Sequence, residues 1–450
     1  MIAEHMYPKV GYWHAARISL FPVKRCSFAV VAITKKADRF LSLLSRTPAD
    51  TGAHRLIKKL VLSSPKSVSL ETLSHLLSPQ TSYLLSDHAL PLYMIMTEME
   101  WFQWNGKLAA ELAALLYKQG RTSESESLVA ESISRLGPSE SDRDLSLFLC
   151  ELLESHANHG SSNGFDETFE RLSELVRESN SIYVKRQSYK AMVRGLCEMR
   201  RPSQAEALLT SKSLEGNVSM FELRCVMQGY GRLGMLSDME RVFLMMEKKM
   251  KGQSLDTVSF NMMLFSYAAH NAIGKMMECV RRMTELGVPL SLRTCNTVFN
   301  SCPSLTRAIG MDESQSPVSV TELEMELTEE ERALVGDLGQ RVLEVEGVMT
   351  WGTVEWKLDL HGMHLSTAYI VILEWLRAMK RILRSDRAGR VDVTVVCGLG
   401  NHSGVRGESP VRSLVKKMIT RIGIPMRVDR KNKGCFVAKG KVMEQWLKNL

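Results

Sequence analysis

Along most of the chain, apolar residues recur three and four positions apart. This spacing is nearly continuous from about residue 91 to residue 309, where strict alternation of apolar and polar residues is scarce. It places the apolar side chains on one face of a helix, so a succession of amphipathic helices is predicted. Only the C-terminal hundred or so residues change to the two-residue period of strands.

The helical region repeats itself. Four segments open with an apolar or aromatic residue and reach the end of a first helix seven positions later, and they start at Tyr189, Leu223, Phe260 and Cys295. The intervals between these starts are 34, 37 and 35 residues, with room for a second helix in each. Weaker copies lie at 110–117 and 148–155. Such a period is typical of a solenoid of helical hairpins, each of which buries its apolar face against its neighbours.

The best copy, residues 257–291, contains Ser-Phe-Asn near its start and Arg-Met-Thr-Glu-Leu-Gly near its end, with a proline shortly after. These residues and the 35-residue period resemble the pentatricopeptide repeat, and a tetratricopeptide array is the structural near-neighbour. The resemblance implies an RNA-binding array over residues 66–310.

In that family two positions read one base: the second residue after the opening aromatic and the last residue of the repeat. Here the pairs are Ala191 with Met220, Cys225 with Thr257, and Met262 with Leu292. None is a standard pair of the family, so a protein-binding surface stays an alternative.

The C-terminal region alternates between strand and helix patterns. In Lys357-Leu358-Asp359-Leu360-His361-Gly362 the two leucines share one face of a strand, and the carboxylate and the imidazole share the other. Strands are predicted at 355–362, 391–397, 424–430 and 434–439, with helices at 366–383 and 410–422 and a short terminal helix at 443–447. The order βαβαββ predicts a two-layer α/β domain over residues 347–450, with a four-stranded sheet and both helices on one face. Trp351 and Trp356 flank the first strand and are interpreted as core.

A glycine loop follows the second predicted strand, with the sequence Cys397-Gly398-Leu399-Gly400-Asn401-His402-Ser403. It leads into a helix for which Ser409 is the expected cap and Pro410 the first residue. A glycine loop that enters a helix N-terminus offers backbone N–H groups to an anion. A phosphate-binding end of the domain is therefore predicted.

The Leu-Asp-Leu-His strand and this glycine loop, in this order and at this spacing, resemble the two signatures of the small MutS-related (Smr) domain, although Cys397 stands where that family has threonine. The resemblance implies phosphodiester cleavage with Asp359 and His361 as catalytic residues. Asp359 would hold a divalent metal (Mg²⁺ or Mn²⁺) or orient water, and His361 would act as general base or acid. The alternative is an Asp–His pair that only fixes the strand end. The phosphate would be gripped by Gly398, Gly400, His402, Ser403, Arg406 and Arg412.

Charge is distributed unevenly along the chain, whose net charge is +8. Residues 311–346 hold eleven acidic and two basic residues, a net −9, and are interpreted as a linker. Residues 347–450 hold nineteen basic and eight acidic residues, a net +11. The basic C-terminal domain favours a polyanionic partner, which is single-stranded RNA in the pentatricopeptide context, with DNA possible.

The first 65 residues are basic, with eleven Lys or Arg against three acidic residues. That composition matches an organelle transit peptide, and the alternative is a disordered basic arm that binds RNA. The nine cysteines form no CxxC pair, which favours buried free thiols over zinc ligands, and no apolar run has the length of a membrane span.

These patterns and the two family resemblances together imply an organellar RNA-binding protein, in the chloroplast or mitochondrion with the chloroplast slightly favoured. It would act in RNA processing or stability, with Smr-type endonuclease activity. The alternatives are a non-catalytic RNA binder that protects transcripts or aids translation, and a helical scaffold for a protein partner.

Overall fold

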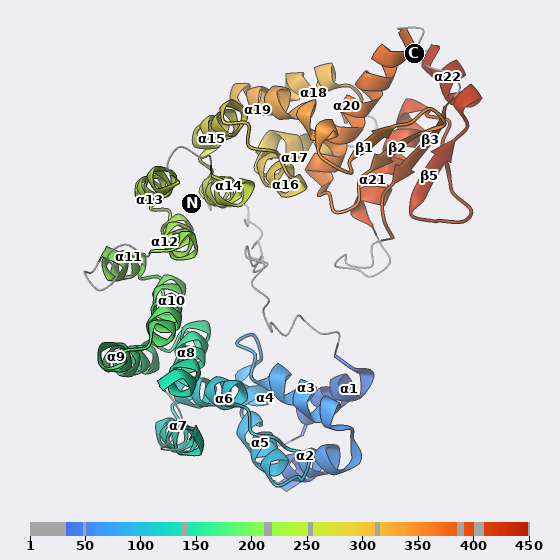
Figure 1. Cartoon of the computed structure of the whole chain (residues 1–450). Coiled ribbons are helices and arrows are strands. Elements are labelled where there is room, and N and C mark those ends of the chain that lie inside the picture. Colours follow the sequence, from blue (N-terminus) through green and yellow to red (C-terminus); the bar gives the residue numbers. More distant parts are fainter. Residues whose placement is uncertain are drawn as a thin grey trace, which may run out of the picture. The chain divides into compact units, whose positions relative to one another are not determined.

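The structure is a computed structural model of the chain (Figure 1). It describes residues 33–47, 51–136, 142–210, 218–250, 255–310, 316–384, 391–399 and 409–448. Contacts within the chain divide it into two units, residues 1–192 and 193–450, and each is described by itself.

The first unit is helical. Helices that follow one another pair as hairpins, as α6 does with α7 and α8 with α9, and α6 also packs on α8. The helices are α1 (Lys35–Leu44), α2 (Thr51–Ser63), α3 (Lys66–Leu76), α4 (Tyr83–Ser86), α5 (Ala89–Thr97), α6 (Gly106–Lys118), α7 (Thr122–Leu136), α8 (Asp142–His159) and α9 (Ser162–Glu178), and α10 (Ile182–Glu198) continues into the second unit.

Helices α1 and α2 lie within the first 65 residues and correct the expectation that this whole stretch is an N-terminal arm. Thr34 caps α1, and its backbone N–H donates to the Glu71 carboxylate of α3 at 2.6 Å. Phe40, Leu44 and Ile57 are buried. The apolar spacing of these two helices outweighs their basic charge, so the folded part begins near residue 33. The rest of the expected arm lies in residues 1–32, outside the described residues.

The second unit begins with the predicted hairpin repeats. Within a hairpin, α12 pairs with α13 and α14 pairs with α15. The first helices of successive hairpins also stack, so α12 contacts α14 and α14 contacts α16. The helices are α11 (Pro202–Thr210), α12 (Met220–Arg232), α13 (Leu236–Lys249), α14 (Thr257–Ala269), α15 (Ile273–Glu285), α16 (Leu292–Asn300) and α17 (Pro303–Ile309). The prediction of a helical-repeat solenoid is confirmed for these elements.

Local signals at the helix ends explain the repeat length. Ser219, Asp256 and Ser291 cap α12, α14 and α16, and each side-chain oxygen accepts a backbone N–H of the first turn. The first helix of a hairpin then ends at a residue with left-handed backbone, which is Gly234 (φ 74°) after α12 and Asn271 (φ 53°) after α14. A polar cap and a left-handed stop therefore recur at α12 and α14, one repeat apart.

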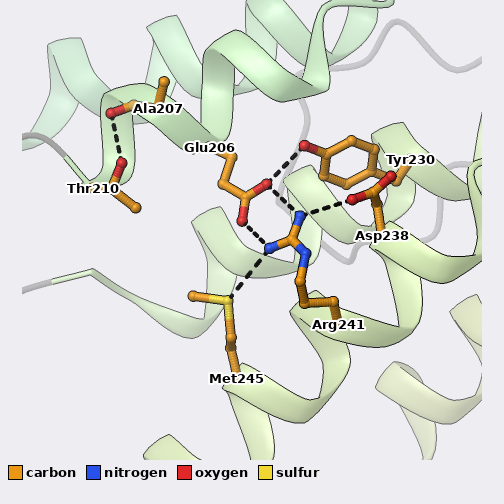
Figure 2. A network of polar contacts seen from close by, with 7 residues as sticks. All are labelled: Glu206, Ala207, Thr210, Tyr230, Asp238, Arg241 and Met245. Carbon is orange, nitrogen blue, oxygen red and sulfur yellow. Dashed lines mark hydrogen bonds and ion pairs between the residues drawn. The ribbon is translucent and has the colours of Figure 1, made fainter.

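Polar side chains connect successive hairpins in the same register. Figure 2 shows the Glu206 carboxylate accepting hydrogen bonds from the Tyr230 hydroxyl at 2.7 Å and from the Arg241 guanidinium at 2.5 and 2.9 Å. Arg241 lowers the pKa of Glu206. One repeat later, Glu240 accepts from Tyr267 at 2.9 Å and from Lys275 at 2.6 Å. The same Tyr–Glu–cation contact thus joins consecutive repeats.

The acidic segment 311–346 is a packed part of the fold, which corrects its interpretation as a linker. It forms α18 (Val320–Glu326), α19 (Glu329–Gly339) and the 3-10 helix η2 (Arg341–Glu344). Leu323, Leu334 and Leu338 are buried, and α19 contacts both α15 and α20. Glu331, only 1% exposed, accepts the backbone N–H of Ser304 at 2.9 Å. Part of the acidic charge therefore caps helices instead of facing solvent.

The C-terminal domain has five strands, one more than predicted, in the order β1-β2-β3-β5-β4. Its elements are β1 (Met349–Trp351), β2 (Glu355–Asp359), α20 (Leu365–Arg384), β3 (Asp392–Val396), α21 (Pro410–Ile422), β4 (Arg427–Val428), β5 (Cys435–Ala438) and α22 (Gly440–Lys448). Strands β2 and β3 are parallel, and the other neighbours are antiparallel. The extra strand β1 is only three residues long, too short for an alternating pattern to reveal it.

Two sequence expectations bear on the described residues as a whole. None of the helices in the described ranges is both long enough and apolar enough to cross a membrane. Eight cysteines in these ranges are free, and all except Cys150 are buried, as predicted for packed thiols.

Candidate functional site at the strand ends of the C-terminal domain

The side chains around Asp359 alternate between core and surface as predicted. Leu358 and Leu360 are fully buried, whereas the Asp359 side chain is 28% exposed and His361 is exposed. Strand β2 ends at Asp359, and the chain turns at Gly362, which has a φ of 77°. The carboxylate and the imidazole therefore lie at the C-terminal end of a buried strand.

The Asp359 carboxylate holds the turn that carries His361. Its Oδ1 accepts the backbone N–H of His361 at 2.9 Å. Its Oδ2 lies 3.7 Å from the ammonium group of Lys357, two residues earlier on the same face of β2. Sequence reasoning missed the part played by Lys357, although its two-residue spacing from Asp359 was the available signal.

The glycine loop meets the Asp-His turn at this sheet edge. Because β2 and β3 are parallel, their C-terminal ends coincide, and the backbone N–H of Leu360 donates to the carbonyl of Val396 at 2.8 Å. Gly398 follows β3 with a φ of 76°, and a Cβ there would lie 3.4 Å from Cδ2 of His361. The two motifs, distant in sequence, thus form one surface in which glycine backbone lies against the imidazole.

Gly434 supports the glycine loop from beneath, and sequence reasoning missed it. The backbone N–H of Cys397 donates to the carbonyl of Gly434 at 2.8 Å. A Cβ at Gly434 would lie 3.2 Å from the carbonyl carbon of Gly398, tighter than an ordinary contact. A single glycine just before a strand was its signal, because such glycines often mark close backbone approach.

The start of α21 adjoins the same loop. Ser409 caps this helix as predicted, since its hydroxyl accepts the backbone N–H of Arg412 at 3.2 Å and donates to the Cys397 carbonyl at 3.3 Å. The Nε of Arg412 is buried and has no hydrogen-bond partner within the described part of the chain. The other predicted phosphate ligands lie in residues 400–408, outside the described residues, and are Gly400, His402, Ser403 and Arg406.

Cys397 does not replace the threonine of the Smr signature. Its side chain is 5% exposed, and burial raises the pKa of the thiol to about 12. A neutral, buried thiol offers no hydroxyl-like contact to a phosphate at the surface. Among the described residues of this end of the domain, the backbone of the loop and Arg412 are the groups left to meet the prediction of a phosphate site.

Helix α16 of the repeat array fixes the turn that follows His361. The Asn296 amide donates to the carbonyl of Gly362 at 3.0 Å and accepts the backbone N–H of His364 at 3.0 Å. Asn300 donates to Nδ1 of His364. The turn is therefore held by the array as well as by its own sheet. Sequence reasoning missed both asparagines.

The described residues around Asp359 do not form a metal shell. No group of three or more His, Cys, Asp or Glu side chains that could hold a metal ion occurs in the ranges that the structure describes. Asp359 is the one carboxylate of the predicted site, and an ammonium group and a backbone N–H already approach its two oxygens. Because hard divalent cations need several oxygen ligands, these residues alone do not fit a resident Mg²⁺ or Mn²⁺.

The first position of each expected base-reading pair is buried, whereas the second positions, Met220, Thr257 and Leu292, are half-buried. Ala191, Cys225 and Met262 are 4%, 5% and 2% exposed, so these side chains face packed neighbours and cannot contact a base here. The polar residue beside Met262 is Asn261, whose amide donates to the Ser291 hydroxyl at 3.1 Å and accepts from the Thr294 hydroxyl at 2.7 Å. That amide links α14 to the start of α16.

Comparisons with known proteins agree with the repeat pattern. The family model of the PPR (pentatricopeptide) repeat matches residues 224–250 and 258–288. A pentatricopeptide repeat-containing protein of Arabidopsis thaliana is 47% identical over 432 residues, which cover 94% of this chain and 84% of that protein. Another from the same plant is 34% identical over 20% of this chain and 11% of its own length.

Two solved structures of the maize pentatricopeptide repeat protein PPR10 are also similar. The crystal structure of that protein has a TM-score of 0.39 and 14% identity, and covers 86% of this chain and 55% of that chain. PPR10 in complex with an 18-nt psaJ RNA element has a TM-score of 0.32 and 14% identity, and covers 86% of this chain and 66% of that chain.

Proposed function

The chain belongs to the pentatricopeptide-repeat family, and on that premise we propose that it binds single-stranded RNA in an organelle and acts in RNA processing or stability. The net charge of +11 on residues 347–450 supports a polyanionic partner. Burial of the first position in each expected base-reading pair favours contact through other residues of the array and through the C-terminal domain.

We further propose that the C-terminal domain is an Smr domain that cleaves RNA. The single observation that carries this proposal is the contact between the two motifs, in which Gly398 lies against the His361 imidazole at the end of the parallel strands. An exposed imidazole beside a glycine loop and a helix N-terminus combines a proton-transfer group with an anion site.

In this mechanism an RNA phosphate lies on the loop at Gly398 and near the N-terminus of α21. The His361 imidazole takes the proton of the attacking hydroxyl, from water or from the ribose, as the new P–O bond forms. The same imidazole returns a proton to the leaving oxygen as the old P–O bond breaks. Asp359 positions His361 through its backbone N–H, while Lys357 and Arg412 stabilise the negative charge that develops on the phosphate.

The test is cleavage of labelled transcripts by the full chain with divalent metal in the buffer, compared with the His361→Ala variant. The proposal expects discrete products from the unmutated protein and a rate lower by about 10²–10⁴-fold for the variant, the usual contribution of a general acid–base group. Equal rates for the two proteins would exclude His361 as the catalytic group.

A non-catalytic RNA binder is the second candidate, and the Cys397 substitution favours it. A buried thiol in place of the usual threonine removes one phosphate contact that the Smr signature implies. In this case intact RNA would be bound equally by the unmutated protein and by His361→Ala, and the loop would act as a phosphate clamp.

The proposed organellar location rests on the basic N-terminal sequence. A fluorescent fusion of the full chain is expected to accumulate in chloroplasts, or in mitochondria, and a fusion that lacks residues 1–32 is expected to stay outside both. Equal distribution of the two fusions would contradict a targeting role for these residues.

A further inference from the structure

A cavity lies away from the Asp359 site within the same unit. Its volume is about 380 Å³, and it is lined by Gln340 and by residues of η2, β1 and α20, among them Glu344, Met349, Trp351, Glu374 and Arg381. Trp351 pairs with Trp356 at the start of β2, whereas Asp359 ends that strand three residues later. At ~3.3 Å per residue, the two sites are about 10 Å apart along the strand.

Trp351 gives the cavity an aromatic wall. Its side chain is 41% exposed, while its neighbour Trp356 is 7% exposed, so the sequence interpretation of both as core holds only for Trp356. The two rings meet edge to face, with centroids 4.8 Å apart and planes at 85°. An exposed indole held by a buried one is a rigid platform for stacking.

Glu374 gives the cavity a polar floor with an unused acceptor. Its side chain is 3% exposed, and Oε1 accepts from Arg377 at 3.3 Å. Its Oε2 is buried and has no hydrogen-bond partner among the residues that the structure describes. A Cβ at Gly339 would lie 3.1 Å from Glu374 Oε1, so the absence of a side chain at Gly339 makes room for the carboxyl. A buried acceptor without a partner is costly, which favours a ligand that donates to it.

Basic side chains stand on the same face of α20 as this carboxyl. Glu374, Arg377 and Arg381 are spaced by three and four residues, so they share one face of the helix. Arg377 and Arg381 are exposed, and Arg381 lines the cavity. Glu344, which is exposed, also lines the cavity, so its charged groups are two carboxyls and the Arg381 guanidinium. A ligand that suits this arrangement presents hydrogen-bond donors to the carboxyls and an anionic group to Arg381.

We propose that this cavity binds one unpaired nucleotide of RNA, with its base stacked on Trp351 and its exocyclic amino group donating to Glu374. The phosphate then lies against Arg381. Cytosine and adenine carry such an amino group, whereas uracil presents a carbonyl at that position, so the cavity prefers the amino bases. The inference rests on the proposed RNA binding and adds a base preference that the Asp359 site does not supply.

The test measures binding of the full chain to ten-nucleotide oligo(C) and oligo(U) by fluorescence anisotropy. Trp351→Ala is expected to weaken oligo(C) binding by about ten-fold, within the range found for loss of one stacked base, and Trp351→Phe to retain most of it. Glu374→Gln is expected to reduce the preference for oligo(C) over oligo(U), because an amide can donate to uracil. Val354→Ala, on the same β1–β2 hairpin and 79% exposed, is the matched control and should bind like the unmutated protein.

The outcomes separate this inference from the proposed function. If the unmutated protein binds both oligonucleotides and Trp351→Ala binds oligo(C) equally well, the cavity is not a nucleotide site and RNA binding stands. Equal affinity of the unmutated protein for oligo(C) and oligo(U) also overturns it. If neither oligonucleotide binds, the cavity proposal and the proposed RNA binding are both overturned. Binding of an arginine-rich peptide through Trp351, without any binding of RNA, would overturn both as well. Melting temperatures of the four variants show whether each is folded.

Discussion

The hairpins of the second unit and the strand-end site next to them are held together in different ways. In the hairpins, the Tyr230–Glu206–Arg241 contact (Figure 2) recurs one repeat later as Tyr267–Glu240–Lys275, so these consecutive repeats are fixed by similar contacts. At the site, single contacts with no repeat fix His361, through the carboxylate of Asp359 and the close approach of Gly398. Stability is therefore shared among repeats, whereas the site depends on a few atoms.

This difference predicts where a substitution is felt. Loss of one inter-hairpin contact removes one of several similar contributions to the free energy of unfolding, so the expected effect is small and limited to stability. Loss of one contact at the strand ends moves the imidazole or the loop, so activity changes more than stability does. The predictions below test that contrast, from the largest effect to the smallest.

Gly398→Ala is expected to reduce RNA cleavage by about 10²–10³-fold, the range seen when one oxyanion donor is displaced. Its φ of 76° disfavours alanine, and the new Cβ would approach the His361 ring. Single-turnover cleavage rates measure the effect.

Gly423→Ala is the matched control for that change. Gly423 ends α21 with a φ of 69°, and a Cβ there meets nothing within 4 Å. Both variants should lose about 1–2 kcal/mol of stability from the left-handed backbone, but only Gly398→Ala should lose activity. Equal losses of activity would mean that backbone strain alone explains the result.

Acid should destabilise the first unit through one buried imidazole. His156 is 3% exposed, and burial, followed by the nearby His159, lowers its pKa from 6.5 to about 4. Between pH 6.5 and about pH 4, His156 is therefore protonated in the unfolded chain but neutral in the folded chain. Stability falls as the pH falls from about 6.5 to about 4, by about 3 kcal/mol in total.

Urea unfolding at pH 7 and pH 4.5 measures this loss in the full chain, with His156→Gln as the test variant. The variant should be less sensitive to pH than the unmutated protein, while His54→Gln, at an exposed histidine of the same unit, should retain the full dependence. An unchanged difference in His156→Gln would show that other groups cause the acid sensitivity.

Asn296→Ala should weaken the site from outside the C-terminal domain. Two hydrogen bonds to the turn at Gly362 and His364 are lost, at a cost of about 1–2 kcal/mol, and the His361 imidazole is less well positioned. The cleavage rate should fall about ten-fold, while the affinity for RNA stays within two-fold of that of the unmutated protein. This combination is expected because the catalytic geometry loosens but no contact with RNA is lost. An equal fall in affinity would place Asn296 in RNA binding instead.

Glu206→Gln should have the smallest effect. The amide can still accept from Tyr230, but the ion pair with Arg241 is lost, and that arginine is 47% exposed, so solvent screens the pair. About 0.5–1 kcal/mol of stability should be lost in urea unfolding, with cleavage unchanged. Glu240→Gln, at the same position of the next repeat, should behave alike; a loss of activity in either would break the contrast between hairpins and site.

Regular local patterns explain which parts of this fold were predictable. The three-and-four spacing of apolar residues gave the hairpins, and the alternation at Leu358 and Leu360 gave β2 together with the sides on which Asp359 and His361 lie. The start of α21 was also predictable from the sequence, because the cap Ser409 and the first-turn residue Pro410 act on their immediate neighbours.

The remaining features depend on contacts between distant residues or on weak local patterns. The Asn296 contact with Gly362 joins residues 66 positions apart and has no pattern around it. The acidic charge of segment 311–346 and the basic charge of α1 and α2 obscured apolar faces that pack well. Strand β1 forms because β2 offers an edge, not because three residues favour a strand.

The most direct test compares cleavage by the unmutated protein, Asp359→Asn and Asp359→Ala on the same labelled transcript. Asparagine can still accept the backbone N–H of His361 through its Oδ1, whereas alanine cannot. If Asp359 positions His361, Asp359→Asn keeps most of the cleavage activity and Asp359→Ala loses it while both still bind RNA. Loss of cleavage in both variants would mean that the charge of Asp359 is itself required, and undiminished cleavage by Asp359→Ala would contradict a catalytic site at these strand ends.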